Sequence, residues 1–295
     1  DEGAKGFLRL ASEVLFKKDD RVLFMAEDST AFEGVTRPVD MGGIGFNYKW
    51  NMGFMNDVLR YFKREPIHRK WHHHDITFGL TYAFSEQFVL PFSHDEVVHG
   101  KGTLLTRMPG DYWQKFANYR LLMGLYITHP GKKLLFMGQE FAHFQEWSVH
   151  RQLDWNLFEF QSHDKANHFV RDLFGLYKTE RALYETDHDK EGFEWIDSTN
   201  AEQSIYSFIR YSKDKHEHLV VVLNMTPVVY HNFEIGVPEK GSYVEIMNSD
   251  FVKYGGSDQY NGLLLEAIDE PRHNRPHHIK ITLGPLTAVI LKFKG

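Results

Sequence analysis

The 295-residue chain contains no cysteine. This absence excludes disulfides, thiolate metal sites and cysteine nucleophiles, and it fits a reducing compartment. No apolar run approaches the roughly 18 residues that cross a bilayer, so we expect no membrane-spanning helix. A basic excess is also missing, because 34 Lys and Arg stand against 40 Asp and Glu. The resulting net charge of −6 argues against nucleic-acid phosphates as the main partner.

Aromatic residues are abundant instead and make up 15% of the chain. Histidine is also frequent, with 18 residues. Aromatic faces suit flat apolar ligands and the CH-rich faces of sugars, but most aromatic side chains simply fill cores. We therefore expect core packing for most of them, including Trp113 on the apolar face of a helix.

The first part of the chain alternates short apolar runs with amphipathic stretches. Runs at 22–26, 88–92 and 134–137 are too short for helices and predict buried strands. Stretches at 56–63, 111–128 and 165–183 predict helices. Such alternation indicates an α/β fold, with a parallel sheet covered by helices. We expect about four βα units over residues 1–183, with strands beginning near Arg21, Gly42, Gln87 and Lys132.

After about Tyr184 the pattern changes to short runs of β-branched and aromatic residues separated by turn signals. This pattern predicts an antiparallel β domain over residues 184–295, organised as a sandwich. The expected strands are 205–211, 218–224, 243–247, 278–282 and 288–292.

Polar clusters follow three of the apolar runs: Glu27-Asp28, His94-Asp95-Glu96 and Gln139-Glu140. The carboxyl ends of parallel strands form the active-site edge of α/β sheets and barrels, so these clusters are expected to converge. Solvated loop charges are the simpler alternative. Paired carboxylates at such an edge suit glycosidic bond chemistry, in which one protonates the leaving oxygen and another attacks or activates water.

Four segments resemble, in order, motifs of the α-amylase clan in the form seen in bacterial glycogen branching enzymes. They are Val22–Thr30 (VLFMAEDST), Gly45–Gly53 (GFNYKWNMG), Leu90–Gly102 (LPFSHDEVVHGKG) and Leu135–Trp147 (LFMGQEFAHFQEW), the last followed by Leu153-Asp154-Trp155. The resemblance implies the C-terminal half of a (β/α)8 TIM barrel, followed by an all-β domain.

The resemblance also implies roles for single residues. Glu27 would be the general acid/base, Asp95 the stabiliser of the oxocarbenium-like transition state, and His94 a hydrogen-bond partner of sugar hydroxyls. The implied reaction cleaves α-1,4 links of a glucan and forms α-1,6 branches by a retaining double displacement. No cofactor or metal is needed, and a cytoplasmic location is implied.

The family's nucleophilic Asp, which ends the fourth strand, has no counterpart in this sequence. Residues 7–20 resemble the helix that follows that strand. The expectation is a C-terminal portion that is inactive by itself. Its unpaired sheet edges would pair with the missing half of the barrel or with a second copy.

Five further residues are candidates for substrate binding: Trp50, Lys101, Gln139, Glu140 and Trp147. Trp50 and Trp147 follow strands and could stack on glucose rings, with packing the equally weighted alternative. For Lys101, a solvated side chain is the commoner outcome. We assign no metal site to His72-His73-His74, because three consecutive residues cannot all face one ion in regular structure.

Two other functions stay open. The first is an α-glucan or maltooligosyltrehalose-type hydrolase of the same clan, which would have a similar cleft. New α-1,6 linkages would indicate transfer, whereas new reducing ends alone would indicate hydrolysis. The second is a glucan-binding fragment without turnover.

Overall fold

Four parallel strands form the sheet of the first part of the computed structural model, which describes residues 1–295. They lie side by side in chain order: β1 (Met25–Ala26), β2 (Tyr48–Trp50), β3 (Phe88–Phe92) and β4 (Lys132–Leu135). Four strands were expected from the sequence, but only 88–92 is the buried strand that was predicted. Of the run 22–26 only the last two residues pair as β1, and Val22 and Leu23 are exposed because this edge of the sheet has no further neighbour. The run 134–137 is shifted to 132–135 and is half-buried. Pro91 is tolerated inside β3 because β2 has already ended beside it, and the Asn51 carbonyl there accepts from the Met55 amide instead.

The first part of the chain also contains six α-helices: α1 (Glu2–Lys18), α2 (Met52–Phe62), α3 (His74–Thr77), α4 (Tyr112–Thr128), α5 (Gln161–Thr179) and α6 (Arg181–Tyr184). The expected helix at 56–63 begins earlier, because the Asn51 side chain caps it by accepting from the Phe54 amide at 2.8 Å. The expected helix at 165–183 is two helices, because Glu180 between them is extended (φ −88°, ψ 105°).

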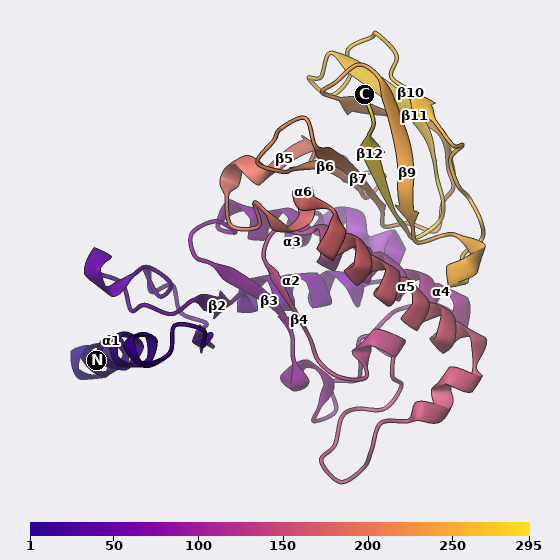
Figure 1. Ribbon diagram of the computed structural model, residues 1–295. Helices are drawn as coiled ribbons and strands as arrows, with labels where there is room; N and C mark the ends of the chain where they lie inside the picture. The colour runs from indigo at the N-terminus through magenta and orange to yellow at the C-terminus, as the bar shows by residue number, and fades with distance from the viewer.

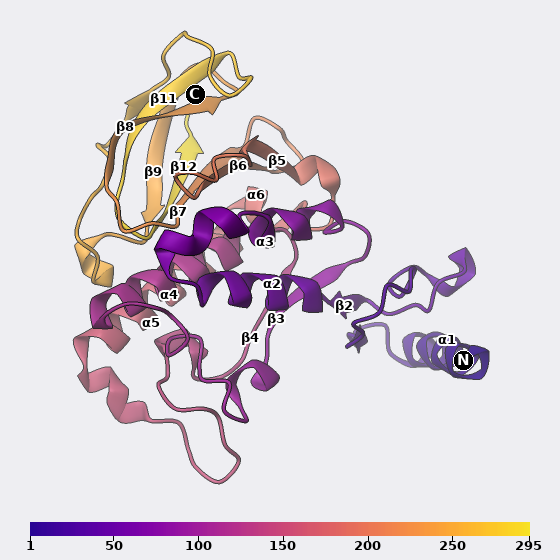
Figure 2. The same ribbon diagram turned by 180° about the vertical axis from the view of Figure 1, so that it is seen from behind.

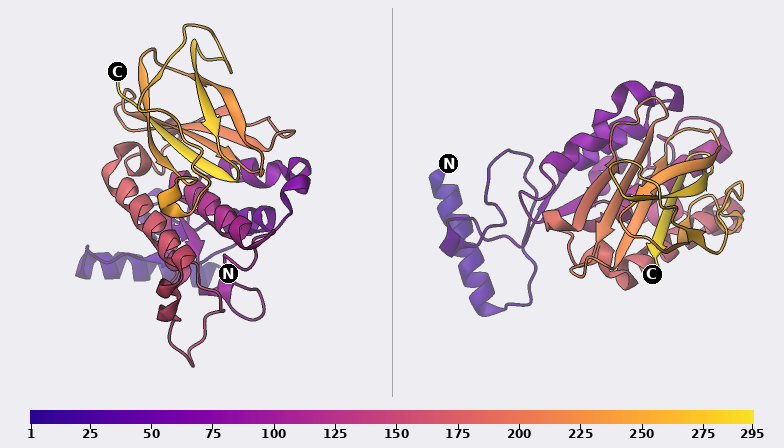
Figure 3. Two further views of the ribbon diagram at one scale, coloured as in Figure 1. Left: turned by 90° about the vertical axis from the view of Figure 1, so that its right-hand side faces the viewer. Right: turned by 90° about the horizontal axis from the view of Figure 1, so that it is seen from above.

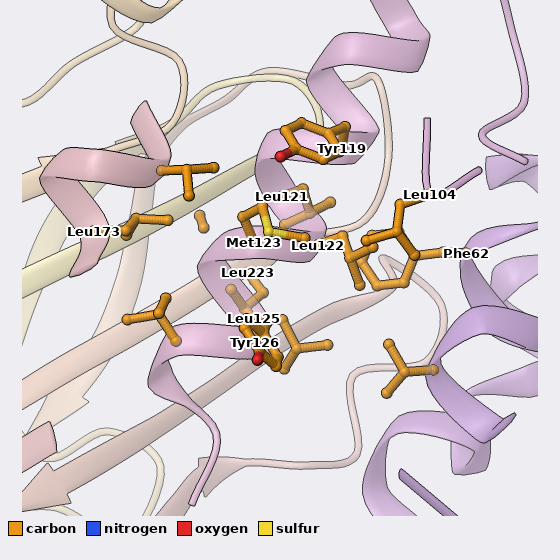
Figure 4. Packing of buried hydrophobic residues seen from close by; sticks show 14 of the residues in the cluster. Phe62, Leu104, Tyr119, Leu121, Leu122, Met123, Leu125, Tyr126, Leu173 and Leu223 are labelled. Carbon is orange, nitrogen blue, oxygen red and sulfur yellow. The ribbon is translucent and has the colours of Figure 1, made fainter. Parts of the chain in front are cut away.

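Helix α4 is the centre of the main core. Every residue from Phe116 to Thr128 is buried, and Figure 4 shows its side chains packed among those of Phe62 from α2, Leu173 from α5 and Leu223 from the second part of the chain. The cluster contains 39 buried residues drawn from both parts. A helix that is buried on all sides requires packing partners on all sides. For α4, strands of the second part of the chain cover one side.

The second part of the chain consists of β strands, apart from two short 3-10 helices. A six-stranded antiparallel sheet has the order β10-β9-β12-β7-β6-β5, and β11 and β8 form a second sheet. A smaller core of 14 buried residues lies between the two sheets, so the layers form a sandwich. The strands are β5 (Phe193–Asp197), β6 (Ile205–Tyr211), β7 (His218–Asn224), β8 (Tyr230–Val237), β9 (Ser242–Asn248), β10 (Leu265–Glu266), β11 (His277–Leu283) and β12 (Thr287–Phe293).

All five strands expected in this part are present, whereas β5, β8 and β10 were not predicted. The predicted domain boundary, between residues 183 and 184, falls inside α6. The division into domains 1–183 and 184–295 stays a prediction.

The two parts stack, with the β sheets above the helices (Figure 1). Helix α5 lies on the side of the molecule that faces the viewer in Figure 1, and α2 and α3 lie on the side that faces the viewer in Figure 2. Helix α1 projects away from this body, as the view from above shows clearly (Figure 3). Strands β1 and β4 are the outer strands of the parallel sheet. Apolar side chains are exposed near the β1 edge, including Phe7 (68%), Leu10 (59%) and Leu23 (63%). None of the helices combines the length and apolar character that a bilayer crossing requires.

The long connection between β1 and β2 carries only the short 3-10 helix Val39–Met41. It is fixed by Glu86, whose carboxylate accepts from the amides of Gly34, Val35 and Thr36 at 2.6, 2.9 and 2.8 Å. Three charge-assisted bonds from consecutive amides anchor this loop to the start of β3.

Candidate active site

His94 and Asp95 lie together directly after β3. The Nε2 atom of His94 is 3.3 Å from Oδ1 of Asp95, and each side chain is about half exposed. Ser93 caps the short helix His94–Val97, and Glu96 closes the cap by accepting from the Ser93 amide at 2.6 Å. Burial raises the pKa of Glu96. This carboxyl is occupied in the cap, so Asp95 is the carboxylate of this segment that faces solvent.

Two aromatic rings and a lysine complete what we call the strand-end cluster: His94, Asp95, Lys101, Phe136 and Trp147. The Trp147 ring is 6.2 Å from that of His94 and 5.4 Å from that of Phe136, both edge-on. Lys101 donates from Nζ to the Asp95 carbonyl at 2.6 Å. An imidazole, a carboxylate and an amine beside a half-buried indole are groups of the kind that bind sugar hydroxyls and stack on a sugar face.

Glu27 lies directly after β1 and is exposed. It lines a hollow of about 450 Å³ whose walls include Met25, Phe32, Ile44 and Phe46. Lys5, Asp28 and Thr30 also line this hollow, so its walls combine apolar and polar side chains.

Lys49 organises the loop that follows Glu27. Its side chain is only 6% exposed, and Nζ lies 2.9 Å from Oδ2 of Asp28 and donates to the Thr30 carbonyl at 3.0 Å. Burial opposes the charge of Asp28, but the bonds from Lys49 and Thr30 outweigh it and hold the pKa of this carboxyl below its ordinary value. The neighbour of Glu27 is therefore an ionised carboxylate tied to β2.

The contacts do not join Glu27 to the strand-end cluster. In the sheet register Ala26 is level with Lys49, and Lys49 with Phe88, the first residue of β3. Glu27 thus leaves the sheet near the start of β3, whereas Asp95 lies beyond its end. No hydrogen bond or ion pair links the two carboxylates, and the hollow beside Glu27 does not include Asp95. Their convergence on one sugar stays a prediction.

The remaining candidates divide into two groups. Trp147 and Lys101 belong to the strand-end cluster. Gln139 is buried and turned inward, where its amide oxygen accepts from the Leu104 amide at 3.3 Å. Glu140 is half-buried, and Trp50 lines a separate hollow of about 370 Å³ with Asp28 and Tyr82.

Two residues that sequence reasoning missed are Lys49 and Glu146. A lysine within the short run Tyr48-Lys49-Trp50 is itself a signal, since a charge on a buried strand requires a partner. Glu146 lies in the loop after β4, and its carboxylate binds amides of the loop after β3. No local sequence pattern indicates this contact between the two loops.

His73, the middle residue of the histidine triplet, has a structural role. His73 is buried, stacks on Tyr206 with ring centroids 4.1 Å apart, and bonds through Nε2 to the Ser198 carbonyl at 2.8 Å. Burial lowers the pKa of His73, which keeps the ring neutral. No group of three His, Asp or Glu side chains has the arrangement of a metal site.

Comparison with known proteins identifies relatives along nearly the whole chain. The 1,4-alpha-glucan branching enzyme GlgB of Bacillus cereus (strain Q1) is 53% identical over 292 residues, which are 99% of this chain and 45% of that protein. The enzyme of the same name from Bacillus anthracis (strain CDC 684 / NRRL 3495) is 52% identical over the same shares. The chain therefore spans less than half the length of these curated relatives.

Solved structures show the same fold at low identity. The alpha-amylase from H. orenii superimposes with a TM-score of 0.63 at 15% identity, covering 99% of this chain and 57% of that one. A Nostoc punctiforme debranching enzyme gives 0.61 at 16%, covering 98% and 54%. Residues 195–294 match the family described as alpha amylase, C-terminal all-beta domain. These matches confirm the resemblance that the four motifs indicated: the chain is a homologue of 1,4-alpha-glucan branching enzymes and ends in an alpha-amylase-type all-β domain.

Proposed function

We propose that the chain contributes the acid/base half of a glucan-branching active site. Two observations support this together: 53% identity to a branching enzyme over 99% of the chain, and Glu27 and Asp95 each following a parallel strand. The substrate would be an α-1,4-glucan, the enzyme would be cytoplasmic, and no cofactor would take part.

In this proposal Glu27 acts twice. As an acid it protonates the glycosidic oxygen of the leaving chain, and as a base it takes the proton from the 6-hydroxyl of the acceptor. The carboxylate of Asp95 stabilises the positive charge that develops on the sugar. His94, held by Ser93 at 3.0 Å and by Asp95, is oriented to bond the hydroxyls of the same sugar.

The covalent step needs a further carboxylate as nucleophile, and we assign no residue of this chain to it. We therefore propose that the chain alone does not complete the reaction. The exposed apolar side chains near β1 would then be covered by further barrel strands or by a second copy. Sedimentation tests the second possibility, since a monodisperse monomer would exclude self-association.

A chimera tests the activity. The matched segment of the Bacillus cereus relative is replaced by this chain, and the product from amylose is assayed for α-1,6 links and for reducing ends. Branch formation supports the proposal, and Glu27→Gln and Asp95→Asn should each reduce it by about 10²–10⁴-fold. Growth of reducing ends alone would favour the hydrolase, and binding without product would favour the glucan-binding fragment.

A further inference from the structure

Glu146 connects the loops that follow β3 and β4. Its Oε2 atom accepts from the Gly100 amide at 2.9 Å and its Oε1 atom from the Gly102 amide at 2.6 Å. The adjacent Trp147 amide donates to the Val97 carbonyl at 2.9 Å. The Glu146 carboxylate thus binds two amides of the 99–102 turn. The backbone of the next residue, Trp147, binds Val97, which precedes the turn.

One residue of the 99–102 turn, His99, has a backbone conformation that is costly for a residue with a side chain. His99, Gly100 and Gly102 all have left-handed backbones, with φ of 57°, 77° and 76°. A non-glycine residue in this region is strained unless its surroundings hold it. The amides of Gly100 and Gly102 have no backbone acceptor, so the Glu146 carboxylate is the group that fixes them.

Lys101 lies between the two bound glycines and faces the site. Its Nζ reaches the Asp95 carbonyl, and its own carbonyl accepts from Nε of Arg107 at 2.9 Å. A change in the turn would therefore move the amine of Lys101 and loosen the backbone of Asp95.

We propose that Glu146 is a positioning residue for glucan binding, holding the 99–102 turn so that Lys101 and Asp95 keep the shape that receives the sugar. The inference rests on the proposed function. The same two amide bonds lower the pKa of Glu146, as expected for a carboxylate that binds the turn in its ionised form.

Three single variants of the chain test this inference with maltoheptaose as the probe. Glu146→Gln removes the charge and turns one acceptor into a donor, whereas Glu146→Asp keeps the carboxylate. Glu159→Gln makes the same chemical change at an exposed glutamate that ends the short 3-10 helix Trp155–Glu159 and whose side chain has no bonded partner, and it serves as the control. Calorimetry gives the Kd, hydrogen exchange follows the Gly100 and Gly102 amides, and thermal unfolding reports stability.

We expect Glu146→Gln to weaken maltoheptaose binding roughly tenfold and to speed exchange of both glycine amides, with little change in Tm. Glu146→Asp should recover part of the affinity, and Glu159→Gln should behave as the wild type. Unchanged affinity in Glu146→Gln, or a loss equal to that in Glu159→Gln, would overturn the inference. If the wild-type chain binds no maltoheptaose, the proposed function fails for this chain. Unchanged hydrogen exchange at the Gly100 and Gly102 amides in Glu146→Gln would separately refute the inference that Glu146 holds the turn.

Discussion

Asp187 and Arg210 form an ion pair at 3.0 Å with both side chains fully buried. Arg210 belongs to β6 and also donates to the carbonyls of Thr128 and Leu183, while Asp187 follows α6. The pair therefore binds the end of the helical part to the β sandwich. Burial alone would raise the pKa of Asp187, but the charges of Lys133 and Arg210 outweigh it and lower the pKa to about 2.

Replacing Asp187 by Asn should destabilise the chain by about 3 kcal/mol, because the guanidinium of Arg210 would stay buried without its counter-charge. Unfolding in guanidinium chloride measures this cost. Asp269→Asn is the matched control, since it breaks an exposed pair with Lys240 at 2.9 Å and should cost less than about 1 kcal/mol. Equal costs for the two variants would show that the buried pair does not bind the two parts together.

Lys133, beside this pair, should make stability depend on pH. Burial lowers its pKa to about 7. Between pH 7 and 10 the unfolded state then binds the proton that the folded state has released, so the free energy of unfolding rises with pH. We expect a rise of about 1 kcal/mol from pH 7 to 9, since Lys133 keeps some contact with water. The rise should vanish in Lys133→Met, and its persistence there would assign it to another group.

Lys49→Met should release the loop that carries Glu27. The substitution removes the amine that holds Asp28 and the Thr30 carbonyl, and we expect a loss of about 2 kcal/mol. The loop 27–32 should also become a protease-sensitive segment. Lys18→Met changes an exposed lysine with no bonded partner and should be nearly neutral. A Lys49 variant as stable and as protease-resistant as the Lys18 variant would contradict this role.

The sequence predicted best the elements whose neighbours lie close in the chain or whose burial is complete. Strands β6 and β7 match their predicted bounds because both faces are buried, which produces continuous apolar runs. Strand β8 was missed because its first half is largely polar and exposed, with Asn232 in a left-handed conformation. Its pairing with β11, some 40 residues further on, makes it a strand, and no local pattern encodes that pairing.

The candidate site divides in the same way. The position of Asp95 after β3 follows from the apolar run before it, and its contact with His94 follows from their adjacency. Two relationships across the sheet cannot be predicted from local sequence. The first is that Glu27 lies level with the start of β3 and not with its end. The second is that the Glu146 carboxylate binds the amides of Gly100 and Gly102. Both depend on strand register and loop path, which long-range packing fixes.

Helix α4 and strand β12, from the two parts of the chain, lie close together at Gly124 and Ala288. A Cβ atom added at Gly124 would lie 2.4 Å from the Cβ of Ala288, far inside van der Waals contact. Gly124→Ala should therefore force α4 away from β12 and destabilise the chain by about 1–3 kcal/mol, despite the better helix propensity of alanine.

Two companion variants separate the clash from other effects. Gly175→Ala in α5 adds the same methyl group where nothing lies within 4 Å, and it should stabilise the chain by about 0.5–1 kcal/mol. Ala288→Gly combined with Gly124→Ala removes the colliding atom and should recover part of the loss. Equilibrium unfolding of the four proteins measures these differences. A Gly124→Ala variant as stable as Gly175→Ala would mean that α4 and β12 have room to separate, so that glycine at 124 does not set their distance.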